Sequence, residues 1–213
     1  MKKFFLLITA VTLFSTLCYA QDLGKVYFGI KGGYNYEMAG YSAAKTTPTH
    51  GGYAGIMLKV PFENRLHFVP QIDVNYRSMS AQSLPPKTFS EISEWQCRVM
   101  PLLQIDFKKP DALKNTCFVH FGPSLGFGIT GQQTKQDENG VAATGKLKYG
   151  FMDYGQFDAS AQFGFGYETA GGFRVLLDYT YGLSSMINTD DAPLLKFNAV
   201  NFSIGYWFGK NKK

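Results

Sequence analysis

Apolar and polar residues alternate along most of the chain with a period of two, which is typical of β-strands whose two faces meet different surroundings. Near residue 200 the pattern is clear, because Val200, Phe202 and Ile204 fall on one face and Asn201 and Ser203 on the other. Clusters of Gly, Pro, Asn and Asp separate the alternating segments. The pattern predicts eight strands: Lys25–Met38, Gly51–Phe62, Leu66–Ser78, Glu94–Phe107, Cys117–Thr130, Phe157–Glu168, Phe173–Leu183 and Phe197–Phe208.

The connections between the predicted strands are alternately short and long. Short turns at one end and longer loops at the other are typical of transmembrane β-barrels. We therefore expect an all-β fold: an eight-stranded antiparallel up-and-down transmembrane β-barrel with short periplasmic turns, longer extracellular loops and both mature termini in the periplasm. The short connections are Glu63–Arg65, Lys108–Thr116 and Ala170–Gly172, and the long ones are Ala39–His50, Met79–Ser93, Gly131–Gln156 and Ser184–Lys196.

The two faces of the strands distinguish a membrane barrel from a soluble one. A soluble barrel fills its interior with apolar side chains, whereas a membrane barrel turns them toward lipid. Here the polar face carries many glycines, which suit a crowded interior, and the apolar face carries the large rings. Rings also gather near the strand ends, as in the aromatic girdles of membrane barrels. The pattern favours a membrane barrel over a lipocalin-like barrel or a β-sandwich.

Composition and charge narrow the class further. Hydrophobic residues make up 45% of the 213 residues, aromatic residues 16% and charged residues 17%. This aromatic-rich, charge-poor balance argues against a disordered chain or a coiled coil. The net charge of +5 is spread along the sequence without an interleaved Arg and aromatic stripe. We therefore expect no nucleic-acid partner.

The first 20 residues have the three parts of a secretory signal peptide. Met1–Lys3 is basic, Phe4–Leu17 is uncharged, and Cys18–Ala20 offers small residues at the two positions that a signal peptidase reads. The alternatives are a buried helix, an N-terminal anchor, or a lipid on Cys18, although Leu17 stands where a lipobox has a small residue. We expect cleavage after Ala20, which divides the chain into a signal peptide (1–20) and one barrel domain (21–213). No later apolar stretch is long enough for a transmembrane helix.

Two cysteines, Cys97 and Cys117, belong to the mature chain. Export to an oxidising compartment favours disulfides. The predicted strand pairing, however, places Cys97 opposite Phe127 and Cys117 opposite Phe107. The offset of ten residues along a strand is roughly 33 Å, far beyond the reach of a disulfide. We therefore predict two free thiols.

Several short strand motifs follow one another in a recognisable order. Phe28–Asn35 reads Phe-Gly-Ile-Lys-Gly-Gly-Tyr-Asn, and the later motifs are Val69–Ile72, Val99–Leu102, Phe121–Gly126, Asp178–Leu183 and Ile204–Phe208. In this order they resemble the strands of Bacteroidetes porin-family (PorT-type) outer-membrane β-barrels, over essentially the whole mature chain. The resemblance implies an eight-stranded barrel in the outer membrane of a Gram-negative bacterium. It implies no single activity, because the family includes secretion-associated members. One departure is that Phe208 is followed by Gly-Lys-Asn-Lys-Lys.

The polar face of the predicted strands carries charged residues that form the candidate site. Buried charges must be paired, so we expect a network of ion pairs along the barrel axis. Glu168 and Arg174 flank the turn Ala170–Gly172 and should lie directly opposite each other. The network is either a gate for ions or a structural plug, and the narrow interior of an eight-stranded barrel favours the plug. Its members are Lys31, Asp73, Arg77, Glu94, Arg98, Asp106, Asp158, Glu168, Arg174 and Asp178.

The sequence gives little support for catalysis or a cofactor. His120 and Ser124 share the inner face of one strand but are roughly 13 Å apart, too far for a nucleophile and its base. His50 and Asp190–Asp191 lie in predicted loops and suggest at most a loop-borne acid and base. We expect no metal site, no phosphate-binding loop and no cofactor.

Gly131–Gln156 is the longest predicted loop. Its first part is charged and reads as solvent-exposed, whereas its second half contains Tyr149, Phe151 and Tyr154. We expect this aromatic half to continue the strands above the membrane, although it would also suit a docking surface.

The sequence therefore favours a non-enzymatic outer-membrane barrel with a plugged polar interior. Its expected role is structural, or that of an accessory subunit in an envelope or secretion complex, with outer-membrane lipid and a protein as partners. The alternatives are a narrow porin-like channel for small solutes or ions and, in a different class, an enzyme that modifies lipids or peptides.

Overall fold

The computed structural model describes residues 25–41, 44–83, 89–108, 115–136, 141–150, 154–186 and 194–209. The expected signal peptide, residues 1–20, lies outside these ranges. Ten strands join in one antiparallel sheet. They are β1 (Tyr27–Tyr41), β2 (Ala44–Thr47), β3 (Thr49–Glu63), β4 (Leu66–Ser83), β5 (Phe89–Asp106), β6 (Thr116–Gln136), β7 (Ala142–Lys146), β8 (Phe157–Glu168), β9 (Phe173–Gly182) and β10 (Leu195–Trp207).

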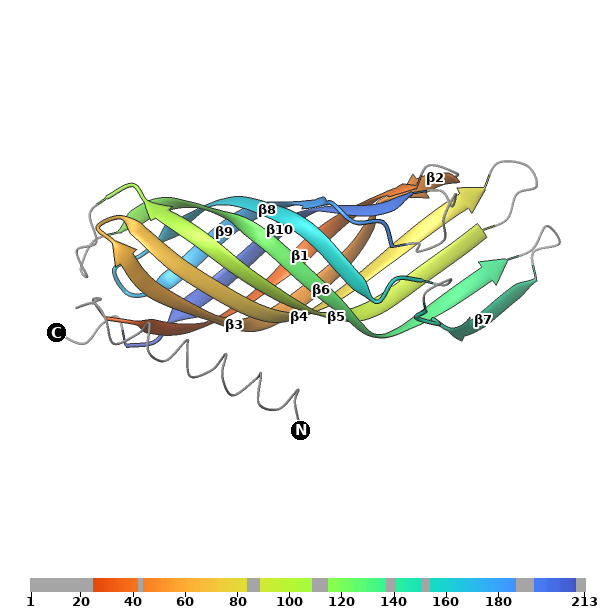
Figure 1. The fold of residues 1–213 in the computed structure, drawn as a ribbon, viewed down its shortest axis with the longest axis horizontal. Coiled ribbons are helices and arrows are strands. Elements are labelled where there is room, and N and C mark those ends of the chain that lie inside the picture. The colour runs from red at the N-terminus through yellow and green to blue at the C-terminus, as the bar shows by residue number, and fades with distance from the viewer. Residues whose placement is uncertain are drawn as a thin grey trace, which may run out of the picture.

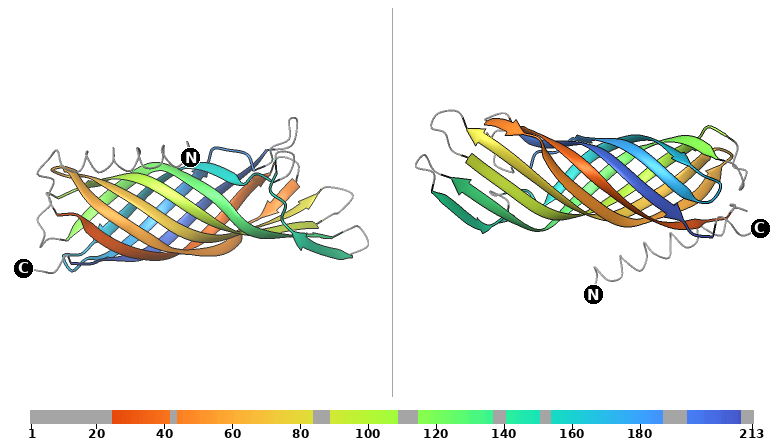
Figure 2. Two further views of the ribbon diagram at one scale, coloured as in Figure 1. Left: turned by 60° about the horizontal axis from the view of Figure 1, so that its bottom comes forward. Right: turned by 180° about the vertical axis from the view of Figure 1, so that it is seen from behind.

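Eight of the strands close into a barrel. Each pairs with its neighbours in the order β1-β3-β4-β5-β6-β8-β9-β10, and β10 pairs with β1. The strands run obliquely to the long axis of the molecule (Figure 1), and β1 and β10 lie side by side when it is seen from behind (Figure 2). The predicted eight-stranded antiparallel barrel is confirmed, and β2 and β7 are additions that pair with β4 and β6.

One end of the barrel carries tight turns. Asn64, between β3 and β4, has a φ of 24°, and Gly172, between β8 and β9, has a φ of 90°. Such left-handed backbone suits Asn and Gly better than other residues. β1 begins and β10 ends at this same end, where the Phe208 amide donates to the Phe28 carbonyl at 2.8 Å. We refer to it as the turn end and to the opposite end as the loop end.

At the loop end the strands are longer than the sequence pattern predicted. The link expected at Met79–Ser93 is mostly strand, because β4 continues to Ser83 and β5 begins at Phe89. The expected exposed loop after Gly131 is also wrong in its first part, since β6 runs to Gln136 and forms a hairpin with β7. Polar residues on both faces had hidden these strands. Paired hydroxyls, such as those of Thr134 and Thr144 at 3.0 Å, fit a strand pair that projects into water.

Through most of the barrel the apolar side chains face outward. Leu125 is 55% exposed and Phe202 50% exposed, whereas Asn201 and Ser203 on the inner face are buried. This is the arrangement of a barrel surrounded by lipid. Rings mark both edges of the apolar band, with Tyr76 packed on Trp95 toward the loop end at 5.2 Å and Phe28 on Phe208 at the turn end at 5.9 Å.

Beyond the Tyr76–Trp95 level the two faces exchange character. In β10, Leu195 and Phe197 face inward and are buried, while Lys196 and Asn198 face outward. We call this part the upper sheet, which comprises β2, β7 and the strand ends 78–83, 89–93, 131–136 and 195–199. It is built like a soluble protein, with polar residues outside and a small apolar core inside. That core contains Ala39, Met79, Ala81, Ile92, Leu147, Tyr154, Met186, Leu195 and Phe197.

The cysteines lie on the outer face, as the pairing predicted. Cys97 is opposite Phe127, and the Phe107 amide donates to the Cys117 carbonyl at 2.9 Å. Both thiols are free.

In the part of the chain that the structure describes, no helix is long and apolar enough to span a membrane.

Candidate functional site in the barrel interior

The ten charged residues singled out from the sequence all project into the barrel. Nine are buried, and the side chain of Asp158 is 11% exposed. Alternation along the strands places them on the inner face, and register between strands sets their order along the axis. They form three successive groups together with polar and aromatic neighbours, from the turn end to the loop end.

The group at the turn end is centred on Lys59. Its Nζ lies 3.0 Å from Oδ2 of Asp106 and 3.2 Å from Oε1 of Glu168. Trp207 Nε1 also donates to Glu168, at 3.0 Å, and His67 Nε2 lies 3.0 Å from Asp106. One ammonium therefore bridges two buried carboxylates, and the fully buried indole of Trp207 donates to one of them.

Arg174 lies directly opposite Glu168 in the register of β8 and β9, as the turn length predicted. Its guanidinium carbon is 4.1 Å from the ring centroid of Phe118 and 5.6 Å from that of Trp207. Nη2 reaches Nδ1 of His120 at 3.4 Å. The Glu168 carboxylate accepts hydrogen bonds from Lys59 and Trp207. Arg174 thus links the first group to the second, because it lies opposite Glu168, packs on the rings of Phe118 and Trp207 and reaches His120.

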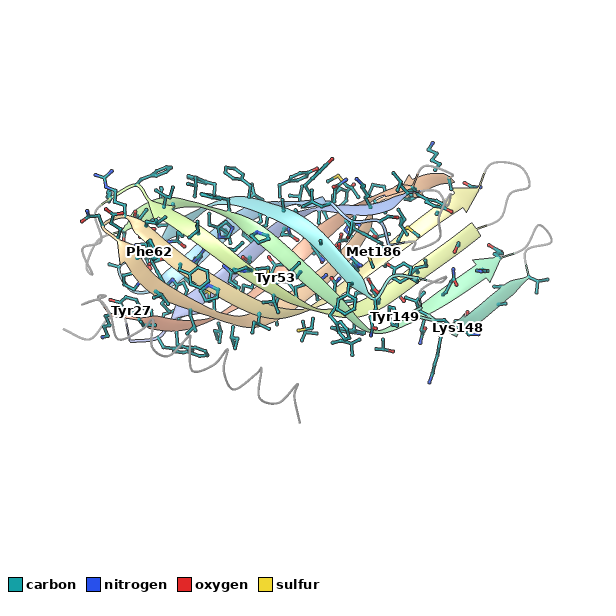
Figure 3. The ribbon with its side chains drawn as sticks, in the orientation of Figure 1. Tyr27, Tyr53, Phe62, Lys148, Tyr149 and Met186 are labelled. Carbon is teal, nitrogen blue, oxygen red and sulfur yellow. The ribbon has the colours of Figure 1, made fainter. Side chains whose placement is uncertain are left out.

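The middle group is centred on Asp73. Its carboxylate accepts two hydrogen bonds from Arg98, at 2.8 and 3.1 Å, and pairs with Lys31 at 2.8 Å. The ring of Tyr53 lies 5.1 Å from the Lys31 ammonium and 4.9 Å from the Arg98 guanidinium. Figure 3 shows Tyr53 near the middle of the barrel. A fork-like bidentate pair of this kind fixes both side chains in one orientation.

His120 and Asp178 form a second contact at this level. His120 Nε2 and Asp178 Oδ1 are in direct contact, and both side chains are buried. With Arg174 at Nδ1, both ring nitrogens of His120 are engaged. The imidazole is consequently held in place and is not positioned to act as a base toward Ser124.

The third group closes the loop end of the charged interior. Arg77 pairs with Glu94 and, at 2.7 Å, with Asp158. The hydroxyls of Tyr149 and Tyr154 donate to Glu94 at 3.2 and 3.3 Å. Burial raises the pKa of both tyrosines, and the Glu94 carboxylate raises that of Tyr149 further, so both hydroxyls remain donors.

The two tyrosines correct the expectation for the aromatic half of Gly131–Gln156. We expected this half to continue the strands, but Tyr149 and Tyr154 are joined by an isolated bridge and their rings lie 6.1 Å apart. They fold inward at the barrel mouth, where their hydroxyls donate hydrogen bonds to the buried Glu94 and their rings cover the Arg77–Glu94 pair. Figure 3 places Tyr149 and Met186 there.

Several interior residues belong to the network but were not among the ten. Lys59 and Glu37 are buried, and strict alternation from Lys31 or Met57 would have placed both on the inner face. Trp207 is also fully buried. It lies two residues after Gly205 and therefore on the inner face, and this spacing could have predicted its burial. The partners Tyr149 and Tyr154 come from a loop, for which periodicity gives no information.

Near Arg77, Gln96 and Asp158 there is a cavity of about 20 Å³, roughly enough for one water molecule. The described residues contain no group of three or more His, Cys, Asp or Glu arranged to hold a metal ion. His50 stacks on Tyr34 at 5.8 Å outside the barrel, and Asp190 and Asp191 lie outside the described residues. The described interior is occupied by paired charges and their polar and aromatic neighbours.

The closed barrel, its apolar outer band and its polar interior together define an outer-membrane β-barrel. The family described as "Outer membrane protein beta-barrel domain" matches residues 19–188, and the chain belongs to this family. A search of curated proteins found no significant match to the sequence.

Solved structures of bacterial surface barrels are similar to this chain. Ail, the attachment invasion locus protein of Yersinia pestis, is 11% identical with a TM-score of 0.48, over 86% of this chain and 99% of Ail. Neisserial surface protein A is 11% identical with a TM-score of 0.45, over 84% and 96% of the two chains. OprG from Pseudomonas aeruginosa is 12% identical with a TM-score of 0.45, over 85% and 95%.

Proposed function

We propose that this outer-membrane barrel is a non-enzymatic, non-conducting accessory subunit of an envelope complex, of the PorT type found in Bacteroidetes. The observation that carries the proposal is the succession of buried ion pairs in the barrel interior. Three groups of paired charges, centred on Lys59, Asp73 and Arg77, succeed one another along the axis. A solute would have to separate buried ion pairs in each group, and each separation exposes an uncompensated charge.

The proposed orientation follows from the two ends of the barrel. Short turns are periplasmic in barrels of this class and longer segments face the outside. On this basis the turn end, with the start of β1 and the end of β10, faces the periplasm after export by the signal peptide. The upper sheet then projects from the outer surface, with lipid around the apolar band.

The upper sheet supports the proposal of a protein partner because, among the described residues, β7 pairs with β6 alone. The Leu147 amide donates to the Gly131 carbonyl at 2.9 Å. Because every second residue of an antiparallel strand bonds to its neighbour, the backbone groups of 143 and 145 also bond to β6. Those of Ala142, Thr144 and Lys146 point away from β6. An edge of this kind is a template for an added strand from another protein.

The interior also argues for a non-enzymatic role. Its histidine at position 120 is engaged at both nitrogens, and its carboxylates at 73, 94, 106 and 178 are bound to cations or histidine. These groups stabilise one another, so each of them is already engaged in a structural contact.

Conductance tests whether the interior is closed to ions, and purification tests the partner. The wild-type protein in a planar bilayer should give no discrete current steps, and regular steps would support the alternative of a narrow channel. The tagged protein, purified from native outer membranes in mild detergent, should carry a stoichiometric protein identified by mass spectrometry.

Two variants of β7 make the second experiment specific. Thr144→Pro removes an outward-pointing amide without removing a bond to β6, so it should lose the partner, whereas Thr144→Val should keep it. Recovery of the wild-type barrel alone, or equal recovery with both variants, would contradict the accessory role at this edge.

A further inference from the structure

Two prolines face each other across the line along which β5 and β6 pair, which we call the β5–β6 seam. The Phe107 amide of β5 donates to the Cys117 carbonyl of β6, so every second residue counted from these two directs its backbone groups across the seam. Pro101 and Pro123 are such residues, and the aligned pairs on either side place them directly opposite each other. Two residues in this position normally exchange two N–H···O bonds. Neither proline has an N–H, so both bonds are missing here.

The pairing of the two strands is interrupted at these prolines. Aligned pairs stop at Val99 with Leu125 and resume at Leu103 with Phe121. At the same level β5 remains aligned with β4, and β6 remains aligned with β8. The interruption therefore belongs to the β5–β6 seam itself and not to an irregular path of either strand.

This part of the seam lies in the apolar band. Pro123 is exposed on the outer face, two residues before the exposed Leu125. Proline is normally confined to edge strands and bulges, whereas here two prolines stand inside a closed wall. The lipid around the band provides no water to replace the missing backbone bonds. The proline pair is consequently a weak point of the wall within the membrane.

In the part of the chain that the structure describes, ion pairs brace the two ends of this seam rather than its middle. Lys59 of β3 reaches Glu168 of β8 at the turn end, and Arg77 of β4 reaches Asp158 of β8 at the loop end. Between these two bridges the buried pairs join β5 to β4 and β6 to β9. The strands can therefore part at the two prolines while these pairs stay intact.

We infer that the β5–β6 seam is a hinge built into the barrel, at which the wall opens locally around Pro101 and Pro123 while both ends stay closed. The buried Met100 and Leu102 flank Pro101 on the inner face, between the middle group and the turn-end group. Opening at this level exposes that part of the interior to the membrane. The movement is lateral and does not follow the barrel axis, so it is independent of the proposed accessory role.

Amide hydrogen exchange tests the inference. The mature protein is placed in lipid nanodiscs and transferred to D2O, and exchange is followed residue by residue by NMR. Four amides bond across the seam beside the prolines, those of Val99, Leu103, Phe121 and Leu125. The amides of Gly32 and Ile204 serve as the reference, because they form an aligned pair between β1 and β10 within the same apolar band.

The four seam amides should exchange about tenfold faster than the reference amides or more, since two missing hydrogen bonds together are worth about that factor. Local opening of this kind is what exchange reports for amides that are otherwise protected by strand pairing.

Two variants assign the opening to the prolines. Pro101→Ala with Pro123→Ala supplies both missing N–H groups and should slow the exchange of the four seam amides by about tenfold. Pro70→Ala is the matched control. Pro70 is aligned with Pro101 on β4 but directs its backbone toward β3, because the Arg65 carbonyl and every second residue after it face β5. This variant should leave the four amides unchanged. Each variant is first checked for the heat-dependent gel mobility of a folded barrel.

Three outcomes would overturn the hinge. One is equal exchange of the seam and reference amides in the wild type, which decides the question even where a variant does not fold. Another is rapid exchange of the seam amides that persists in the folded double variant, because the opening would then have a different cause. The third is equal slowing by Pro70→Ala, which would indicate a general stiffening of the wall.

Discussion

The guanidinium of Arg77 lies over the ring of Phe197, with 4.1 Å between the guanidinium carbon and the ring centroid. Arg77 belongs to the third charged group, and Phe197 belongs to the apolar core of the upper sheet. This contact is therefore the junction at which the interior changes from polar to apolar. A planar cation suits the position, because it pairs with carboxylates at its edge and packs on a ring with its face.

Replacing Arg77 by Met should destabilise the barrel strongly. The change leaves the buried Glu94 and the partly buried Asp158 without their cation, and loss of one partner of a buried pair costs about 3–5 kcal/mol. Urea unfolding in detergent, followed by tryptophan fluorescence and gel mobility, measures the loss. Arg65→Met, at an exposed turn position, is the matched control and should unfold like the wild type. Equal midpoints for the two variants would show that the pair contributes little.

Gly164→Ala should disrupt the contact between His120 and Asp178. A Cβ at this position would overlap Asp178 Oδ1 and lie 2.5 Å from His120 Nε2. Overpacking of this kind costs about 1–3 kcal/mol. Gly32→Ala provides the comparison, because a Cβ there meets only a backbone oxygen at 3.7 Å. Differential scanning calorimetry of both variants should show a lower Tm for Gly164→Ala alone, and a matching decrease for Gly32→Ala would argue against this specific clash.

A cationic substitution on the outer face should destabilise the barrel in the apolar band and be tolerated in the upper sheet. Leu125 is 55% exposed among other apolar outward residues, so Leu125→Arg should cost about 2–4 kcal/mol when the barrel folds into lipid. Ser80→Arg lies on the outer face of the upper sheet and should cost less than about 0.5 kcal/mol. Folding into liposomes from urea measures both. A similar cost at the two positions would place the membrane boundary elsewhere.

The free cysteines should show lipid protection. Cys97 and Cys117 are half-buried on the outer face, where lipid covers the apolar band. In proteoliposomes a charged methanethiosulfonate should label them at least tenfold more slowly than the membrane-permeant N-ethylmaleimide, and urea should remove the difference. Intact mass should correspond to two thiols. Rapid labelling by the charged reagent in liposomes would contradict the assignment of this face to lipid.

The strands of the barrel were predictable because alternation is a local property. Phe157–Glu168 matches β8 at both ends, and Phe173–Leu183 differs from β9 by one residue. The inner face followed from the same alternation, which is why Asp73 and Arg77 were placed inside.

What alternation could not reveal were changes along a strand and contacts between distant segments. At Trp95 the register shifts against β6, so that Ile129 and Thr130 are both exposed and the inner and outer positions exchange. In the upper sheet the apolar residues face inward and the polar residues outward, because this part lies beyond the lipid. The sequence of a single strand does not show where the lipid ends. Likewise, the contacts of Tyr149 with Glu94 join segments 55 residues apart, and only the closed barrel brings them together.

The pairing of β1 with β10 constrains how the protein is made. Thirteen aligned residue pairs, from Gly29 with Trp207 to Tyr41 with Leu195, join the first strand of the barrel to the last. The ring cannot be completed until the segment around Trp207 has crossed the inner membrane, so a nascent chain with only its early strands still has two unsatisfied sheet edges. Such a topology of distant pairings folds slowly. Closure of the β1–β10 seam is therefore the step that pairs the last two open edges of the barrel.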